Sequence, residues 1–192
     1  MSTALARYED QYVAKKALFS FMGNTFRIFG TDGRLQFYIK QKAFRLREEI
    51  NVFHDEAQTQ KRLTIKARSI RDFSGTYDIF DAATGQKIGA AKRQGLKSMF
   101  VDEWTVLDAD DVPVGKCVET GGTMILLRRF FPILPQTYEV RFGDTLEGTI
   151  KQRFSLLQYG YDVDFSPGPG LLDPRLGVGL TVLLLAIESQ RE

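Results

Sequence analysis

LGVGLTVLLLAI, residues 176–187, decides the fold because it is the most apolar run in the chain. A helix that is apolar on every side has no polar stripe to show to water, so it is expected at the centre of a protein. The run has twelve residues and follows Asp173, Pro174 and Arg175, whereas a membrane-spanning helix needs about 20 apolar residues. We therefore predict a buried core helix over residues 174–188 and no transmembrane span.

The chain before this run is a series of alternating segments separated by turns. Four of them share a pattern: an aromatic residue, Ile or Val two places later, a turn with Asp or Gly, and a second alternating segment. They cover residues 26–40, 77–92, 104–118 and 138–151. A single hairpin cannot bury its apolar face, so repeated hairpins must close on one another or cover something. We predict that these hairpins surround the helix.

Period two also predicts which side chains point inward, because successive residues of a strand face opposite sides. The predicted inward pairs are Tyr77 with Ile79, Trp104 with Val106, and Tyr138 with Val140. Two further segments, 43–52 and 62–70, are expected to add strands, with a helix turn as the alternative for residues 43–50. Residues 166–170 (SPGPG) are expected to connect the last strand to the helix. The sequence thus predicts a mainly β single domain over residues 1–192, with strands between about 12 and 165.

Composition narrows the class of protein. A chain of 192 residues with 43% hydrophobic content suits one well-buried domain, and a formal charge of +2 argues against a dedicated nucleic-acid binder. The single Cys117 and the single His54 exclude an internal disulfide and a structural zinc site. The first sixteen residues lack a continuous apolar stretch, so we expect no secretory signal and a cytoplasmic protein, with a peripheral position at the membrane as the alternative.

Catalysis has the weakest support in the sequence. His54 stands beside Asp55, but no nucleophile motif accompanies the pair, so an exposed turn histidine is expected. The glycine turns at 30–33 and 85–89 join hairpin strands and open no helix, so they predict no phosphate loop. We predict no catalytic residues, no cofactor and no enzymatic activity.

Three stretches carry a resemblance to a known family: residues 18–29 (LFSFMGNTFRIF), residues 41–50 (QKAFRLREEI) and the D-x-x-T-G-x-x-I-G turn at 81–89. The sequence resembles the LURP-one-related family of the tubby C-terminal-like group, which includes phospholipid scramblases, from about Tyr12 to Glu188. The resemblance implies a closed antiparallel barrel of about twelve strands around a buried C-terminal hydrophobic helix. Tubby domains bind phosphoinositide headgroups and scramblases move lipids between leaflets. The scramblases' cysteine cluster for lipidation is missing from this sequence.

Basic residues concentrate between positions 40 and 71. On adjacent strands, alternate basic residues would share an outer face and could bind phosphate headgroups. The alternative is an ordinary solvated barrel exterior. The residues predicted to bind an anionic phospholipid or phosphoinositide are Lys40, Lys42, Arg45, Arg47, Lys66 and Arg68.

Two other segments are candidates for contacts. Residues 124–134 are apolar on both faces around Arg128 and Arg129, which predicts burial or a protein interface, or membrane contact through Phe130 and Phe131. Asp162, Asp164 and Ser166 place oxygen ligands at alternate positions that suit Ca²⁺, and Asp173 follows further along the chain; a solvated strand end is the alternative.

Three functions follow from these observations. The first is a tubby-like module that binds anionic lipid headgroups or a partner at the cytoplasmic membrane surface. The second is a soluble regulatory or structural protein-interaction domain without lipid affinity. The third is scramblase-like lipid translocation, in which the helix leaves the barrel. The sequence predicts neither the oligomeric state nor the identity of a ligand or partner.

Overall fold

The computed structural model describes residues 8–17, 24–41, 49–68, 75–94, 103–122, 134–153 and 159–188. Twelve strands and one helix, α2 (Pro174–Glu188), occupy these ranges. The strands are β1 Gln11–Lys16, β2 Asn24–Phe29, β3 Leu35–Gln41, β4 Glu49–Phe53, β5 Lys61–Ala67, β6 Thr76–Asp81, β7 Lys87–Arg93, β8 Glu103–Leu107, β9 Pro113–Thr120, β10 Thr137–Phe142, β11 Thr145–Gln152 and β12 Gly160–Asp164.

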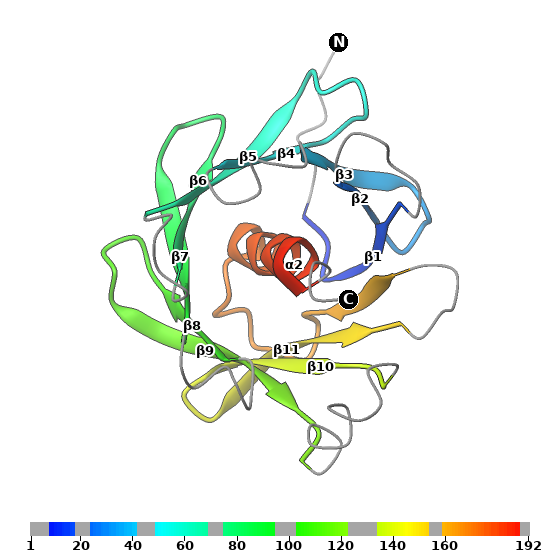
Figure 1. The fold of residues 1–192 in the computed structure, drawn as a ribbon. Coiled ribbons are helices and arrows are strands. Elements are labelled where there is room, and N and C mark those ends of the chain that lie inside the picture. Colours follow the sequence, from blue (N-terminus) through cyan, green and yellow to red (C-terminus); the bar gives the residue numbers. More distant parts are fainter. Residues whose placement is uncertain are drawn as a thin grey trace.

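The strands form one closed antiparallel barrel in which each strand pairs with its neighbours in the sequence (Figure 1). β1 closes the barrel by pairing with β12, from Gln11 opposite Asp164 to Lys15 opposite Gly160. Closure leaves no unpaired strand edge along the described wall, which removes a common site of edge-to-edge aggregation. The predicted twelve-stranded closed barrel is confirmed.

The four predicted hairpins are the pairs β2–β3, β6–β7, β8–β9 and β10–β11. Their turns use residues that accept a left-handed backbone: Gly85 has a φ of 71° and Gly143 a φ of 59°. Glycine adopts this conformation without a steric penalty, so the turn can close between two strands that are already paired. The prediction that segment 62–70 contains a strand is confirmed by β5, whereas only the end of segment 43–52 is described, as β4.

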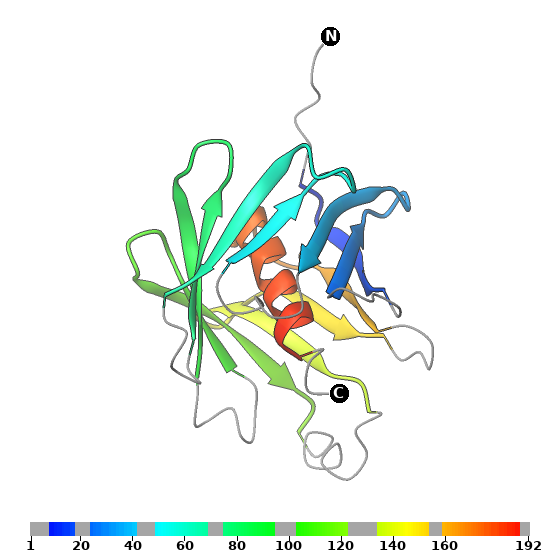
Figure 2. The ribbon, with the colours of Figure 1, turned by 45° about the horizontal axis from the view of Figure 1, so that its top comes forward.

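Helix α2 runs through the barrel and is surrounded by its wall (Figures 1 and 2). Its side chains from Leu176 to Ala186 are buried on all sides, and Leu183 has an exposed fraction of 0%. This is the arrangement expected for a helix without a polar stripe. The prediction of a core helix is confirmed. Among the described residues, no helix combines the length and the apolar content that crossing a membrane would require.

The wall approaches the helix closely at Gly179. A Cβ atom on Gly179 would lie 2.6 Å from Cδ1 of Ile79 in β6, which is shorter than a normal contact. Gly179 costs about 1 kcal/mol of helix propensity, and the close packing against Ile79 explains why a larger residue does not replace it. The inner wall therefore follows the surface of α2 without room for another side chain at this point.

The predicted alternation of the wall is largely confirmed. Ile79, Trp104, Val106, Tyr138 and Val140 are fully or almost fully buried and belong to the core cluster. Tyr77 is only partly buried and packs against the edge of that cluster. Cys117 lies in β9 and is buried, and burial raises the pKa of its thiol to about 12. A thiol of this kind is protonated at neutral pH and therefore a poor nucleophile.

The two ends of the barrel differ in what they carry. We call the end where α2 begins the helix-start end; its described connections are residues 30–34, 54–60, 82–86, 108–112, 143–144 and 165–173. We call the opposite end the helix-finish end; six strands finish there, at Lys16, Gln41, Ala67, Arg93, Thr120 and Gln152. Odd-numbered strands run toward the helix-finish end and even-numbered strands run toward the helix-start end.

Candidate functional site

Three of the six predicted anion-binding residues lie in the described part of the chain. Lys40 is on β3, where Ile39 is buried in the core, so Lys40 points outward. It is exposed, and among the described residues it has no ion-pair partner. Lys42, Arg45 and Arg47 lie outside the described residues, as do Arg128, Arg129, Phe130 and Phe131.

Lys66 is also exposed on the outer wall, with 55% of its side chain accessible to solvent. Its Nζ lies 3.8 Å from Oε2 of Glu49 and 5.8 Å from the ring centre of Phe80. Both contacts are at the long end of their range, and an exposed pair of this kind stabilises a protein by less than about 1 kcal/mol. Lys66 therefore keeps most of its charge available to an anion.

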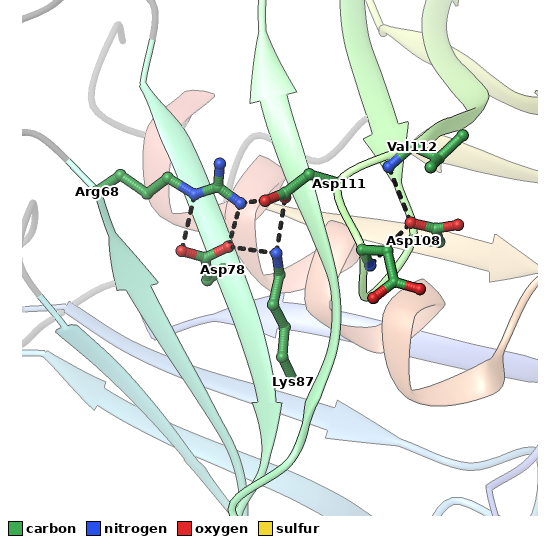
Figure 3. Close-up of polar contacts among 7 residues, drawn as sticks. Arg68, Asp78, Lys87, Asp108, Asp111 and Val112 are labelled. Carbon is green, nitrogen blue, oxygen red and sulfur yellow. Dashed lines mark hydrogen bonds and ion pairs between the residues drawn. The ribbon is translucent and has the colours of Figure 1, made fainter.

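Arg68 differs, because it is held in a network of four charged side chains (Figure 3). Its Nε and Nη2 donate to the two carboxylate oxygens of Asp78 at 2.8 and 2.6 Å, and Nη2 also donates to Asp111. Lys87 donates to Asp111 at 2.6 Å and pairs with Asp78 at 3.3 Å. The hydrogen bonds from Lys87 and Arg68 lower the pKa of Asp111. The two carboxylates thus balance the charges of Arg68 and Lys87.

The network joins parts of the chain that are distant in sequence. Arg68 follows β5, Asp78 lies in β6, Lys87 begins β7, and Asp111 lies in the turn between β8 and β9. The turn is shaped by Asp108, whose Oδ1 accepts the backbone N–H groups of Asp110 and Val112 at 2.9 and 2.8 Å. The geometry gives Arg68 a structural role: it ties this turn to the outer wall.

The aspartates predicted to bind Ca²⁺ are spread over two ion pairs and a turn. Asp162 pairs with Arg153 at 3.1 Å, and Asp164 accepts hydrogen bonds from the backbone and the hydroxyl of Ser166. Asp173 binds Arg175. Within the described ranges, no three His, Cys, Asp or Glu side chains gather where they could hold a metal ion. The metal site stays a prediction from sequence.

Asp173 and Arg175 hold the start of α2 against the wall. Oδ1 of Asp173 accepts the backbone N–H of Arg175 at 2.9 Å, and Nη2 of Arg175 donates to Oδ2 of Asp173 at 2.7 Å. Nη1 of Arg175 reaches Oδ2 of Asp81 at the end of β6, at 2.9 Å. The other oxygen of Asp81 accepts the N–H groups of Ala83 and Thr84 in the following turn. One arginine therefore joins the helix start to the β6–β7 hairpin.

This ion pair predicts a loss of stability in acid. Partial burial opposes ionisation of Asp81, but hydrogen bonds from Arg175, Thr84 and Ala83 outweigh it and keep its pKa below the ordinary 3.8. A lowered pKa contributes stability that is complete above the ordinary value and is lost as the pH falls through the folded-state pKa. We expect Asp81→Asn to lower the free energy of unfolding by about 1 kcal/mol at pH 7.

The measurement is urea unfolding followed by the fluorescence of Trp104, the single tryptophan of the chain, at pH 7 and at pH values below 3.8. The difference between the natural protein and Asp81→Asn should shrink in acid. A difference of the same size at both pH values would show that the charge of Asp81 does not contribute.

Glu147 is a residue that sequence reasoning missed. It is 1% exposed, and its Oε2 accepts the backbone N–H groups of Leu171 and Leu172 at 2.9 and 3.1 Å. Its Oε1 is buried and has no hydrogen-bond partner among the described residues. Glu147 is the extra residue of a β-bulge, because Val140 pairs with Gly148 and Arg141 with Leu146. The bulge turns the carboxylate toward the connector that leads to α2.

The single histidine has a structural contact. His54 Nδ1 lies 2.9 Å from the carbonyl oxygen of Gln36, and the side chain is partly buried rather than exposed as expected. This contact joins the β4–β5 turn to β3 and gives the imidazole a role in the fold.

Comparison with known proteins gives one family and one fold. A family model described as LURP-one-related matches residues 10–184. A crystal structure of a protein from Arabidopsis thaliana matches with a TM-score of 0.52 and 14% sequence identity, over 97% of this chain and 96% of that chain. At this identity the similarity concerns the fold alone. No curated protein matches the sequence.

Proposed function

This chain belongs to the LURP-one-related family, and from its filled barrel and basic outer wall we propose that it is a non-enzymatic module that binds anionic lipid headgroups at the cytoplasmic surface of a membrane. The barrel interior holds α2, whose side chains are buried along the run from Leu176 to Ala186. A ligand would therefore meet the outer wall or an end of the barrel.

The observation that carries the proposal is the exposed lysine pair on β3 and β5. Lys40 is exposed without an ion-pair partner among the described residues, and Lys66 is 55% exposed with one weak ion pair, to Glu49 at 3.8 Å. Ammonium groups of this kind bind the phosphates of headgroups, and each basic residue near an anionic surface contributes about 1 kcal/mol. Arg68 is not included in the proposed surface, because Asp78 and Asp111 already neutralise it.

The test is vesicle flotation of the purified protein with neutral, phosphatidylserine-containing and phosphoinositide-containing liposomes, at low and physiological salt. We expect binding to both anionic compositions, weaker at physiological salt because the Debye length falls to about 8 Å. Reversing Lys40, Lys42, Arg45 and Arg47 to Glu should weaken binding by at least about 100-fold, since four favourable contributions are removed. Neutral liposomes serve as the control.

Absence of binding to every liposome would contradict the proposal. It would favour the protein-interaction function, with Arg128, Arg129, Phe130 and Phe131 as the first residues to change. The third function, scramblase-like lipid translocation, would require α2 to leave the barrel. The side chains of α2 are enclosed by the described wall.

A further inference from the structure

The helix-start end of the barrel is strongly acidic. Its described connections, together with residues 8–10 that lead into β1, contain ten acidic residues and one basic residue, Arg34. The acidic residues are Glu9, Asp10, Asp32, Asp55, Glu56, Asp108, Asp110, Asp111, Asp144 and Asp173. None of them is buried. Asp111 pairs with Arg68 and Lys87, and Asp32, Glu56 and Asp173 pair with Arg34, Arg27 and Arg175. The other six acidic residues have no ion-pair partner among the described residues, so this end keeps a net negative charge although the whole chain is close to neutral.

The helix-finish end has the opposite character. Of the six odd-numbered strands that finish there, five have lysine as their next-to-last residue; β9 has Glu119 instead. The lysines are Lys15, Lys40, Lys66, Lys92 and Lys151. Four of them are exposed and Lys15 is partly exposed. We call these five residues the lysine ring.

Strand register shows that the lysine ring lies at one level of the barrel. Two neighbouring lysine-bearing strands are separated by one even-numbered strand, and both lysines have a cross-strand partner on it. In chain order around the barrel, the partner of the second lysine lies two residues nearer the helix-finish end than the partner of the first. The pairs of partners are Asp162 and Gly160 on β12, Arg27 and Thr25 on β2, and Asp78 and Thr76 on β6. Strands of a closed barrel are tilted and staggered, so a constant step of this kind keeps equivalent positions at one height.

The remaining strands close the ring. On β4, continuing the pairing of Tyr38 with Phe53 places Lys40 beside Asn51, two residues from Glu49, the partner of Lys66. On β8, Lys92 pairs with Thr105, and Glu103, two residues nearer the helix-finish end, pairs with Val118 of β9. On β10, Val118 pairs with Glu139, and Thr137, two residues nearer the helix-finish end, pairs with Lys151. The five lysines and Val118 therefore encircle the barrel.

The charge of the ring is largely free. Lys40, Lys92 and Lys151 have no ion-pair partner among the described residues. Lys66 has a weak ion pair with Glu49 at 3.8 Å, and Nζ of Lys15 lies 5.3 Å from the ring centre of Phe29, a contact that leaves the charge of Lys15 intact. The barrel thus carries free positive charge around one end and acidic turns at the other.

We propose that the barrel docks end-on, lysine ring first, on a bilayer of anionic phospholipid, with the acidic turns pointing away. This inference rests on the function proposed above and adds the orientation and three residues, Lys15, Lys92 and Lys151. A negative surface attracts the ring and repels the opposite end within about one Debye length, so the charge polarity alone favours this orientation. All sides of the wall then contribute, rather than the face of β3 to β5 alone.

The experiment compares lysines on different sides of the barrel. Lys40→Gln, Lys92→Gln and Lys151→Gln are each measured for binding to phosphatidylserine vesicles at one fixed salt concentration. We expect each change to weaken binding by about five-fold, because each removes one basic residue of similar position. The matched control is Lys61→Gln: Lys61 is an exposed lysine at the helix-start end of β5, and its loss should leave binding unchanged. Unchanged emission of the buried Trp104 verifies the fold of each variant.

The outcomes separate the orientation from the function. If the natural protein binds, and only Lys40→Gln weakens binding, the barrel docks side-on through β3 to β5 and the end-on proposal is wrong. If Lys61→Gln weakens binding as much as the ring variants, binding follows net charge and the orientation is again wrong. If the natural protein binds no anionic vesicle, the proposed function itself fails.

Discussion

Leu183→Asp is expected to prevent folding altogether. Leu183 lies in α2 with an exposed fraction of 0% and belongs to the core cluster of buried apolar side chains. The substitution removes a buried leucine, which alone costs about 2–5 kcal/mol, and places an unpaired carboxylate in an apolar core. Domains of this size are stable by only about 5–15 kcal/mol, so the combined cost removes most or all of the margin.

The measurement is the yield of soluble protein, with circular dichroism and Trp104 emission as tests of structure. Leu183→Met is the matched control, because it conserves volume and should cost less than about 1.5 kcal/mol. Soluble Leu183→Asp protein with native spectra would mean that α2 does not form the core in solution.

Glu147→Ala should produce the second largest loss, of about 2–5 kcal/mol in the free energy of unfolding. The alanine leaves the backbone N–H groups of Leu171 and Leu172 without their acceptor, and Leu172 is buried at 5% exposure. A buried donor that loses its partner costs about 1–3 kcal/mol, more where the acceptor was charged. The connector before α2 would lose the contact that holds it to β11.

Glu147→Gln separates hydrogen bonding from charge. The amide keeps one oxygen that can accept the two N–H groups, so we expect less than half of the loss seen with alanine. Urea unfolding of both variants, followed by Trp104 emission, makes the comparison. An alanine variant within about 0.5 kcal/mol of the natural protein would show that the connector does not depend on this carboxylate.

The fold could be predicted because its signals are local. The alternation in Trp104 and Val106, or in Tyr138 and Val140, is visible within a few residues and specifies the inner face. The apolar run at 176–187 specifies a helix with no solvent face. The two signals agree with each other, because hairpins with one apolar face must pack that face against another apolar element, and the helix provides it.

The surface was harder to predict because its partners are distant in sequence. Arg68 looked like a free cation beside Lys66, but Asp78 and Asp111 lie 10 and 43 residues away and reach it only once β6 and the β8–β9 turn are placed. Glu147 looked like an ordinary outward residue of an alternating strand. The bulge that turns it inward is a property of the pairing with β10, which no local pattern records.

The lysine ring could be predicted from the sequence only in part. Lys15, Lys40, Lys66 and Lys92 follow one another at intervals of 25, 26 and 26 residues, and this regularity is present in the sequence. Its meaning depends on the strand ends and on the register, because only these show that the four lysines occupy equivalent positions. A search for charged residues at the period of a strand pair would have found the pattern.

The pairing of β1 with β12 has a consequence for synthesis of the protein. β1 leaves the ribosome early, but its partner on one side, β12, and the helix that fills the barrel are made about 145 to 170 residues later. At roughly 5–20 residues per second, the apolar inner faces of the first strands stay uncovered for about 7 to 35 s. The nascent barrel is therefore an open, aggregation-prone sheet until α2 has been translated, and chaperones that shield exposed apolar strands are expected to associate with it during that interval.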